Sequence, residues 1–173
     1  AVEDILAKHF DENNTVEVWK QCLHSIDLTT LNGEDTTEKV ETMAQRVNEF
    51  EDHFPGVPNV AAMCVYPALV QTAADTLTEP IGIAAVAAGF PASQTFIEVK
   101  IAEAAMAVAA GATEIDIVIS IGKFLEGNYQ EVCDEISEIK AAIKDAILDG
   151  IIPNEYEAAK DYLMQLAKEK GLC

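Results

Sequence analysis

The sequence predicts an α/β fold in which parallel strands alternate with helices. Short apolar runs rich in β-branched residues recur along the chain. Each run is followed by a segment whose apolar residues recur every three or four positions, and glycine or proline separates the two kinds of segment. Strict alternation of this kind requires a parallel sheet, either an open doubly wound sheet or part of a (β/α)8 barrel. The period alone does not distinguish these two architectures.

An N-terminal helical extension is expected over residues 1–25, ahead of the first strand. The stretch VEDILAKHF predicts one short helix and TVEVWKQCLHS a second. Thr15 is placed to cap the second helix, because a threonine hydroxyl accepts a hydrogen bond from a backbone N–H of the first turn. The two helices are predicted to form a lid or an extension ahead of the sheet.

Four strand–helix units are predicted over residues 26–146. Their strands fall in IDLTTL, NVAAMCVYP, IGIAAVAAGFPA and GATEIDIVIS, which are rich in β-branched and small apolar residues. The helix TFIEVKIAEAAMAVAA follows the third strand, and Thr95 with Glu98 has the spacing of a capping box at its start. These units define a partial (β/α)8 barrel of the TIM type, if the sheet is curved.

The fourth strand places carboxylates within an apolar run. A period of two puts the isoleucines from Ile115 to Ile121 on one face, and Glu114, Asp116 and Val118 on the other. Because helices flank it, this strand is expected to be parallel and buried on both faces. An ionised carboxylate is costly to bury unless it is paired or hydrated, so Asp116 is predicted to belong to a site.

A C-terminal helical segment is predicted over residues 147–173. At most a short strand fits at Gly150 to Ile152, and a helix capped by Asn154 is expected to run to Lys170. Glycine and proline are spread through turns and are not gathered into a linker. We therefore expect a single domain over residues 1–173.

The charge of the chain excludes several classes of partner. The formal net charge is -19, with 11 basic residues against 30 acidic ones. No basic patch is available to neutralise phosphates, so nucleic acid and anionic membrane surfaces are not expected partners. No apolar run reaches the roughly 20 residues of a membrane helix, and the first residues lack the basic start of a secretion signal. A cytoplasmic location is predicted.

The cysteines, histidines and glycines form none of the familiar cofactor motifs. The 4 cysteines have neither C-x-x-C nor Cys/His metal spacing, and the 3 histidines stand alone. Neither G-x-G-x-x-G nor G-x-x-x-x-G-K-[ST] occurs, and the G-x-S-x-G of hydrolases is also missing. No metal and no bound cofactor are expected.

Polar residues on or just after the predicted strands are the candidates for chemistry, because ligands of parallel α/β folds bind at the carboxyl ends of strands. Each except Asp116 also has a purely structural interpretation. Asp27 could bond neighbouring backbone, Cys64 could pack as a small apolar residue, and Lys123 could be solvated in a loop. The candidates are Asp27, Thr29, Cys64, Asp116 and Lys123.

Three stretches carry a resemblance to a known family. IDLTTLNGEDTTEKV, NVAAMCVYP and GFPASQTFIEVKIAEAAMAVAAGATEIDIVISIGKFLEGNY together resemble the first four βα units of deoxyribose-phosphate aldolase, a class I aldolase on a (β/α)8 barrel. The match is in order and runs roughly from Ser25 to Lys140. The resemblance implies that Asp116 is the family's strand-four aspartate, which relays protons in Schiff-base chemistry. It implies that the pocket is lined by Asp27, Thr29, Leu31, Cys64 and Phe90.

The chain departs from the family beyond about Lys140. The family's Schiff-base lysine lies in K-T-S-T-G on strand six, and its second lysine and phosphate site follow later; none of these occurs here. Lys123 is the nearest substitute, as a candidate for binding substrate. The leading interpretation is therefore an aldolase-derived half-barrel without aldolase activity of its own. The alternatives are a class I aldolase of deoxyribonucleotide catabolism, which would cleave 2-deoxyribose 5-phosphate once a second half completes it, and a non-catalytic assembly protein.

A homodimer is the expected assembly. Four strands curved for a barrel leave the first and fourth strands with unpaired edges, and they leave an apolar inner face with Val65 and Val118 uncovered. Two copies related by a two-fold axis would pair the first strand of each with the fourth of the other. The negative charge opposes this association at low salt.

Overall fold

A computed structural model describes residues 2–148, with side chains as far as Lys144. In this part of the chain one sheet has the strand order β1-β2-β3-β4, and each neighbouring pair is parallel. The parallel α/β class is confirmed. The strand expected at 150–152 and the helix expected at 154–170 lie outside the described residues. The strands are β1 (Asp27–Thr29), β2 (Ala62–Val65), β3 (Gly82–Ala87) and β4 (Glu114–Ile117).

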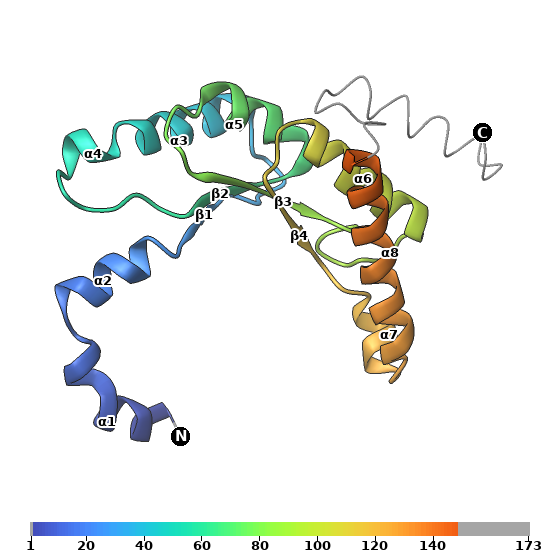
Figure 1. The fold of residues 1–173 in the computed structure, drawn as a ribbon, viewed down its shortest axis with the longest axis horizontal. Helices are drawn as coiled ribbons and strands as arrows, with labels where there is room; N and C mark the ends of the chain where they lie inside the picture. The colour runs from blue at the N-terminus through green and yellow to red at the C-terminus, as the bar shows by residue number, and fades with distance from the viewer. Residues whose placement is uncertain (1, 149–173) are drawn as a thin grey trace.

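Helices connect the strands and cover one side of the sheet (Figure 1). The chain passes from β1 through two helices to β2, from β2 through η1 and α5 to β3, and from β3 through α6 to β4. Two further helices follow β4, and α8 packs along α6. Their bounds are α3 (Thr37–Asn48), α4 (Phe50–His53), η1 (Pro67–Leu69), α5 (Val70–Thr76), α6 (Ile97–Ala109), α7 (Ile121–Leu125) and α8 (Tyr129–Leu148).

The main core lies between the sheet and helices α3, α5 and α6. Alternate residues of the central strands, such as Met63 and Val65 on β2, pack against Val40 of α3 and Val70 of α5. Val65 therefore points to the helix side, and its predicted place on the inner face is wrong. The inner face is instead formed by the small residues that alternate with Met63 and Val65.

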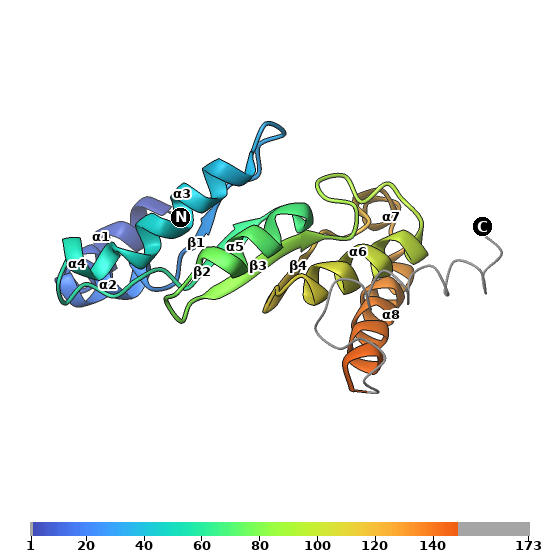
Figure 2. The ribbon, with the colours of Figure 1, turned by 90° about the horizontal axis from the view of Figure 1, so that it is seen from above.

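The N-terminal extension forms two helices, α1 (Val2–Asn13) and α2 (Val16–Leu23). The Thr15 hydroxyl accepts a hydrogen bond from the Val18 N–H at 3.3 Å, which confirms the predicted cap. Lys20 donates to the Gly56 carbonyl at 2.7 Å and ties α2 to the loop before β2. Neither helix contains a buried residue. The two views place α1 at the opposite end of the molecule from the end of α8 (Figures 1 and 2).

Strand β4 is shorter and more exposed than predicted. Its pairing ends with the Val118 N–H on the Ala87 carbonyl, and the Val118 carbonyl then accepts a hydrogen bond from the Ser93 hydroxyl. The chain turns there into α7, so Ile121 is a helical residue that is 44% exposed and not part of a buried strand face. The predicted isoleucine face is thus limited to Ile115 and Ile117, which pack against buried residues under the helices.

The capping box expected at Thr95 and Glu98 does not form. Helix α6 begins at Ile97, and Phe96 occupies the N-cap position without a side-chain hydrogen bond. The loop before the helix turns through positive φ angles at Ala88 and Ser93, which delays the start of the helix past Thr95.

Candidate functional site

The strand register gathers the polar strand residues on the inner face of the sheet, the side not covered by helices. Paired residues of parallel strands point to the same side, and Thr29 pairs with Cys64, which pairs with Ala84, which pairs with Glu114. Asp116 lies one step further along β4, opposite Val86. The alternation therefore brings residues from β1, β2 and β4 to one surface.

Small residues in the middle of this face make room for the acids at its border. Ala62 and Ala84 are buried, and Gly82 pairs with Ala62 two residues before Ala84, the residue that pairs with Glu114. A Cβ atom at Gly82 would lie 2.5 Å from the Glu114 Oε1 and 3.1 Å from the Ala62 Cβ. The carboxylate of Glu114 therefore lies over Gly82, and a larger residue at position 82 would displace it.

Cys64 lies at the centre of this arrangement. Burial raises the pKa of the Cys64 thiol, and the negative charges of Asp116, Asp27 and Glu114 raise it further, against a hydrogen bond with Thr29 that lowers it. The three acids are thus close enough for Cys64 to respond to their charge. The thiol is held in its neutral form, which is not the form of a cysteine nucleophile.

Aromatic and aliphatic side chains border the same face. Leu31, Tyr66 and Phe90 pack against the buried residues of the inner face. The rings of Tyr66 and Phe90 meet edge to face with centroids 6.1 Å apart, and the Tyr66 hydroxyl donates to the Leu31 carbonyl at 3.3 Å. Phe90 is carried by the loop after β3, where the Gly89 N–H donates to Glu103 of α6 at 2.8 Å.

Sequence reasoning did not single out Tyr66 as a site residue. The stretch C-x-Y-P nevertheless indicated it. Tyr66 lies two residues after Cys64, so the period of two along a strand places both side chains on the same face.

Asp116 does not have the burial that the sequence predicted. It is exposed, as are Asp27, Thr29 and Glu114. The reason is that β4 is an edge strand of the described sheet, and its inner face has no helix over it. Asp116 reaches water, so its presence carries no desolvation cost that would have to be offset by a partner.

Lys123 is not brought to this face. It lies in α7, not in a loop, and its ammonium group donates to Glu131 and, at 2.8 Å, to Glu135 of α8. These hydrogen bonds raise the pKa of Lys123, with Glu131 the larger contributor. A lysine that forms a Schiff base needs a lowered pKa, so this environment favours the wrong protonation state.

A second polar cluster, which the sequence analysis missed, lies where α6, α7, α8 and the end of β4 meet. Lys100 of α6 is 2% exposed and donates to the Ser120 hydroxyl at 2.6 Å and to the Glu135 carboxylate at 3.1 Å. Ser120 in turn donates to Glu135 at 2.6 Å. We call Lys100, Ser120, Lys123 and Glu135 the Lys100 network.

The Lys100 network holds Glu135 ionised. Burial raises the pKa of Glu135, but hydrogen bonds from Lys123, Ser120 and Lys100 outweigh it and lower the pKa to about 2. The signal for Lys100 was its spacing: it falls three residues after Ile97 and four before Ala104, on the apolar stripe of α6.

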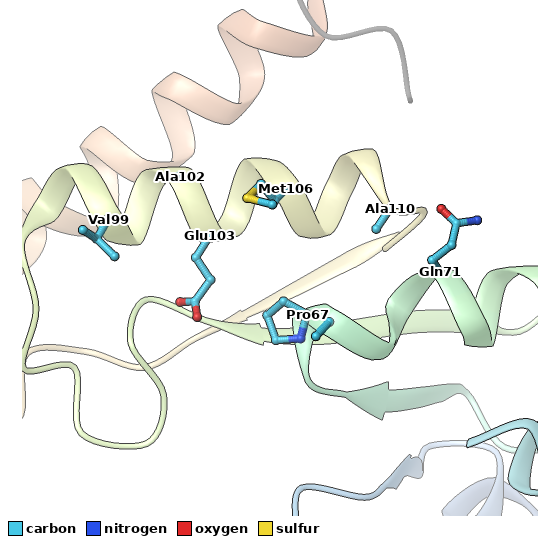
Figure 3. Close-up of a pocket in the computed structure, with 8 residues that line it drawn as sticks. Pro67, Gln71, Val99, Ala102, Glu103, Met106 and Ala110 are labelled. Carbon is cyan, nitrogen blue, oxygen red and sulfur yellow. The ribbon is translucent and has the colours of Figure 1, made fainter. Parts of the chain in front are cut away.

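Two hollows accompany these clusters on the helix side. A groove of about 750 Å³ runs between α6 and the η1–α5 segment, lined by Pro67 and Gln71 on one wall and by Val99 and Met106 on the other (Figure 3). Glu103 also lines it, but its carboxylate is committed to Gly89. A second hollow of about 550 Å³ lies over the Lys100 network. Neither is lined by the acids of the inner face.

Among residues 2–148, no three histidine, cysteine, aspartate or glutamate side chains are grouped so that they could hold a metal ion. No helix in the same part of the chain is long and apolar enough to cross a membrane.

Comparison with known proteins shows the family. The profile described as DeoC/LacD family aldolase matches residues 22–157. The chain belongs to this family. It is 35% identical over 159 residues to the human protein named deoxyribose-phosphate aldolase, covering 80% of this chain and 50% of the relative. It is 37% identical over 136 residues to a Caenorhabditis elegans protein named putative deoxyribose-phosphate aldolase, covering 77% of this chain and 45% of the relative. The chain thus spans about half the length of these relatives.

Solved structures of the same family share the fold. A putative deoxyribose-phosphate aldolase from Coccidioides immitis aligns with a TM-score of 0.63 at 26% identity, over 73% of this chain and 47% of that chain. A deoxyribose phosphate aldolase from Aeropyrum pernix, described as having a unique tetrameric structure, aligns with a TM-score of 0.60 at 24% identity, over 83% of this chain and 56% of that one. The four strands therefore form part of a TIM-type barrel, which resolves the choice that the sequence period left open.

Proposed function

We propose that these 173 residues supply the acid–base half of a deoxyribose-phosphate aldolase site and have no aldolase activity by themselves. The observation that carries the proposal is the inner face, where Asp27, Thr29 and Asp116 surround Cys64. These are the residues that the family resemblance assigns to the pocket. The relatives' names supply the reaction class, an aldolase of deoxyribose phosphate. The family resemblance implies that the reaction cleaves 2-deoxyribose 5-phosphate to glyceraldehyde 3-phosphate and acetaldehyde.

The roles of the two groups follow from the chemistry of cleavage through a Schiff base. Cleavage through a Schiff base needs a lysine that is partly deprotonated and a carboxylate that moves protons to and from the bound carbon skeleton. Asp116 is exposed on the inner face and can serve the second task. Lys100 and Lys123 are both paired with Glu135, so neither is available for the first.

A second polypeptide that supplies the lysine would complete the site. We propose that in this chain Asp116 relays protons, that Asp27 and Thr29 contact the polar part of the sugar, and that Leu31, Phe90 and Cys64 contact its apolar part. Lys123, which the sequence suggested as a substrate contact, is better explained as a partner of α8. With such a partner, the proposed role is in deoxyribonucleotide breakdown.

Where no such lysine-bearing partner is present, the proposed assembly is a homodimer. Strands β1 and β4 each have one open edge in the described sheet, and a two-fold axis would pair β1 of each copy with β4 of the other. A non-catalytic assembly protein remains the second candidate function, favoured by the paired state of Lys100 and Lys123.

The cleavage reaction tests the proposal. The isolated chain, given 2-deoxyribose 5-phosphate, should release no acetaldehyde above the background of a buffer control. The positive control is a full-length relative of the family, assayed in parallel. Acetaldehyde release by this chain that Lys123→Met abolishes would overturn the proposal and make Lys123 the nucleophile.

A further inference from the structure

Helix α6 carries apolar residues on nearly every side, but only part of its surface is covered. Ile101 and Ala104 pack against Ile139 of α8. Ala107 packs in the main core between the sheet and the helices. A helix that is apolar all round is typically buried all round, yet Val99 of α6 is 47% exposed. One stripe of α6 therefore lacks the covering that its composition predicts.

The uncovered stripe of α6 is one wall of the groove of about 750 Å³ shown in Figure 3. The opposite wall is the η1–α5 segment, which contributes Pro67, Ala68 and Gln71. The residues of the stripe span about 16 Å of helix and recur at the spacing by which one helix packs against another. They are Val99, Ala102, Glu103, Met106 and Ala110.

The groove contains a carboxylate that has no cation beside it. Glu103 is half-buried and accepts the Gly89 N–H through Oε2 alone, at 2.8 Å. Figure 3 shows its side chain pointing from α6 toward the segment that carries Pro67. Among the described side chains, which end at Lys144, no lysine, arginine or histidine lies within ion-pair distance of Glu103. A cation brought by another molecule would therefore find an unpaired carboxylate between apolar walls.

The two helices that border the groove add negative charge and no available cation. The other charged residue of α5 is Asp75, and α6 adds Glu98 and Lys100. The ammonium of Lys100 is buried and paired with Glu135. The surface around the groove is therefore complementary to a basic partner, and the net charge of -19 would draw such a partner to the protein.

We propose that this groove docks a basic amphipathic helix of a partner polypeptide. Apolar side chains of the docked helix lie between Val99 and Met106, and a lysine or arginine lays its aliphatic stem on the groove and its charge on Glu103. The unbranched Met106 side chain adapts to the shape of the partner. This inference is independent of the proposed aldolase function, because the acids of the inner face do not line the groove.

The probe is a synthetic helical peptide of about 18 residues, with leucine at i, i+3, i+4 and i+7 and lysine elsewhere. A scrambled peptide of the same composition is the control for charge. Isothermal titration calorimetry in moderate salt, which screens long-range attraction, measures the dissociation constant. Methyl-labelled methionine locates the bound peptide: the Met106 signal should shift, whereas Met43 and Met63, which pack in the main core, should keep theirs.

Two variants that each add a carboxylate separate docking in the groove from attraction to the net charge. Met106→Glu places it in the groove, and Gln45→Glu places it on the exposed face of α3. Attraction to net charge alone would make both variants bind the peptide at least as tightly as the wild type does. Docking in the groove predicts that Met106→Glu raises the dissociation constant by about tenfold or more, and that Gln45→Glu changes it by less than about twofold.

Two variants that each remove a carboxylate test the proposed ion pair. Glu103→Gln keeps an oxygen for the Gly89 N–H and removes the charge, so it should raise the dissociation constant by about fivefold. Glu41→Gln on the exposed face of α3 should change it by less than about twofold. Thermal unfolding checks that each variant folds, and if Met106→Glu does not, the comparison of Glu103→Gln with Glu41→Gln decides.

The outcomes either support the docking groove or overturn it. Binding that shifts the Met106 signal, and that weakens in the groove variants but not in the α3 variants, supports it. A wild type that does not bind the peptide, a Met106 signal that stays in place, or equal affinity for the scrambled peptide overturns it. None of these results bears on acetaldehyde release, which tests the proposed function separately.

Discussion

On the inner face of the sheet, Asp27, Glu114 and Asp116 keep their carboxylates exposed, whereas between α6 and α8 the buried ammonium of Lys100 contacts the half-buried carboxylate of Glu135. Small residues, Ala62 opposite Asp27 and Ala84 opposite Glu114, are the strand neighbours of the first group. In the second group, each charged side chain has an oppositely charged side chain within hydrogen-bond distance. The acids are therefore available to a ligand, and the lysine is not.

This difference separates structural ionisable residues from candidate functional ones. A buried charge is retained only where its partners satisfy it, so the Lys100 network is explained by the fold alone. Exposed acids on the concave face of a parallel sheet have no such structural explanation. Substitutions in the Lys100 network should therefore cost stability, and substitution of an exposed acid should not.

Removal of the buried ammonium should have the largest effect on stability. Lys100→Ala leaves the Glu135 carboxylate with Lys123 and Ser120 and opens a space under α6, so the free energy of unfolding should fall by about 3–5 kcal/mol. Urea denaturation followed by far-UV circular dichroism measures it. The matched control is Lys140→Ala on the exposed side of α8, which should change stability by less than about 0.5 kcal/mol. Equal effects of the two substitutions would mean that the Lys100 network does not hold the helices.

Acid should weaken the same network through Glu135. The pKa of Glu135 is lowered from 4.5 to about 2 in the folded chain, so its stabilising contribution is present above pH 4.5 and is lost as the pH falls toward 2. The full loss is on the order of 3 kcal/mol. Measurement of unfolding free energies for the wild type and Glu135→Gln at several pH values isolates this contribution. The gap between the two proteins should narrow as the pH falls through that range, and a gap that is constant with pH would contradict the assignment.

The sequence predicted the parallel sheet and the gathering of residues on its inner face, because alternation of strand and helix and the period of two are local signals. It did not predict the exposure of Asp116, since whether a strand lies at an edge is decided by which other strands pair with it. It also missed Lys100, whose partners Ser120 and Glu135 lie 20 and 35 residues away along the chain. The sequence shows Lys100 on the apolar stripe of α6, but it does not show which distant residues pair with its ammonium group.

Substitution of the exposed acid should have the smallest effect on stability. Asp116→Asn keeps the size of the side chain and removes a charge that water already solvates, so the free energy of unfolding should change by less than about 0.5 kcal/mol. The measurement is the same urea titration, with Glu135→Gln as the substitution that should be costly. A loss of more than about 2 kcal/mol for Asp116→Asn would mean that Asp116 has a charged partner within the fold.

The central claim, that the inner face formed within residues 2–148 offers acids and no lysine nucleophile, is tested most directly by borohydride trapping with acetaldehyde. The chain is incubated with acetaldehyde and sodium borohydride at neutral pH, digested and mapped by mass spectrometry, with a full-length relative of the family as the positive control. The relative should carry an adduct on one lysine in high yield. The account predicts no such selective adduct on this chain, because Lys100 is buried against Glu135, and Lys123 is hydrogen-bonded to Glu131 and Glu135, which raise its pKa. A stoichiometric adduct on one lysine of this chain would contradict it.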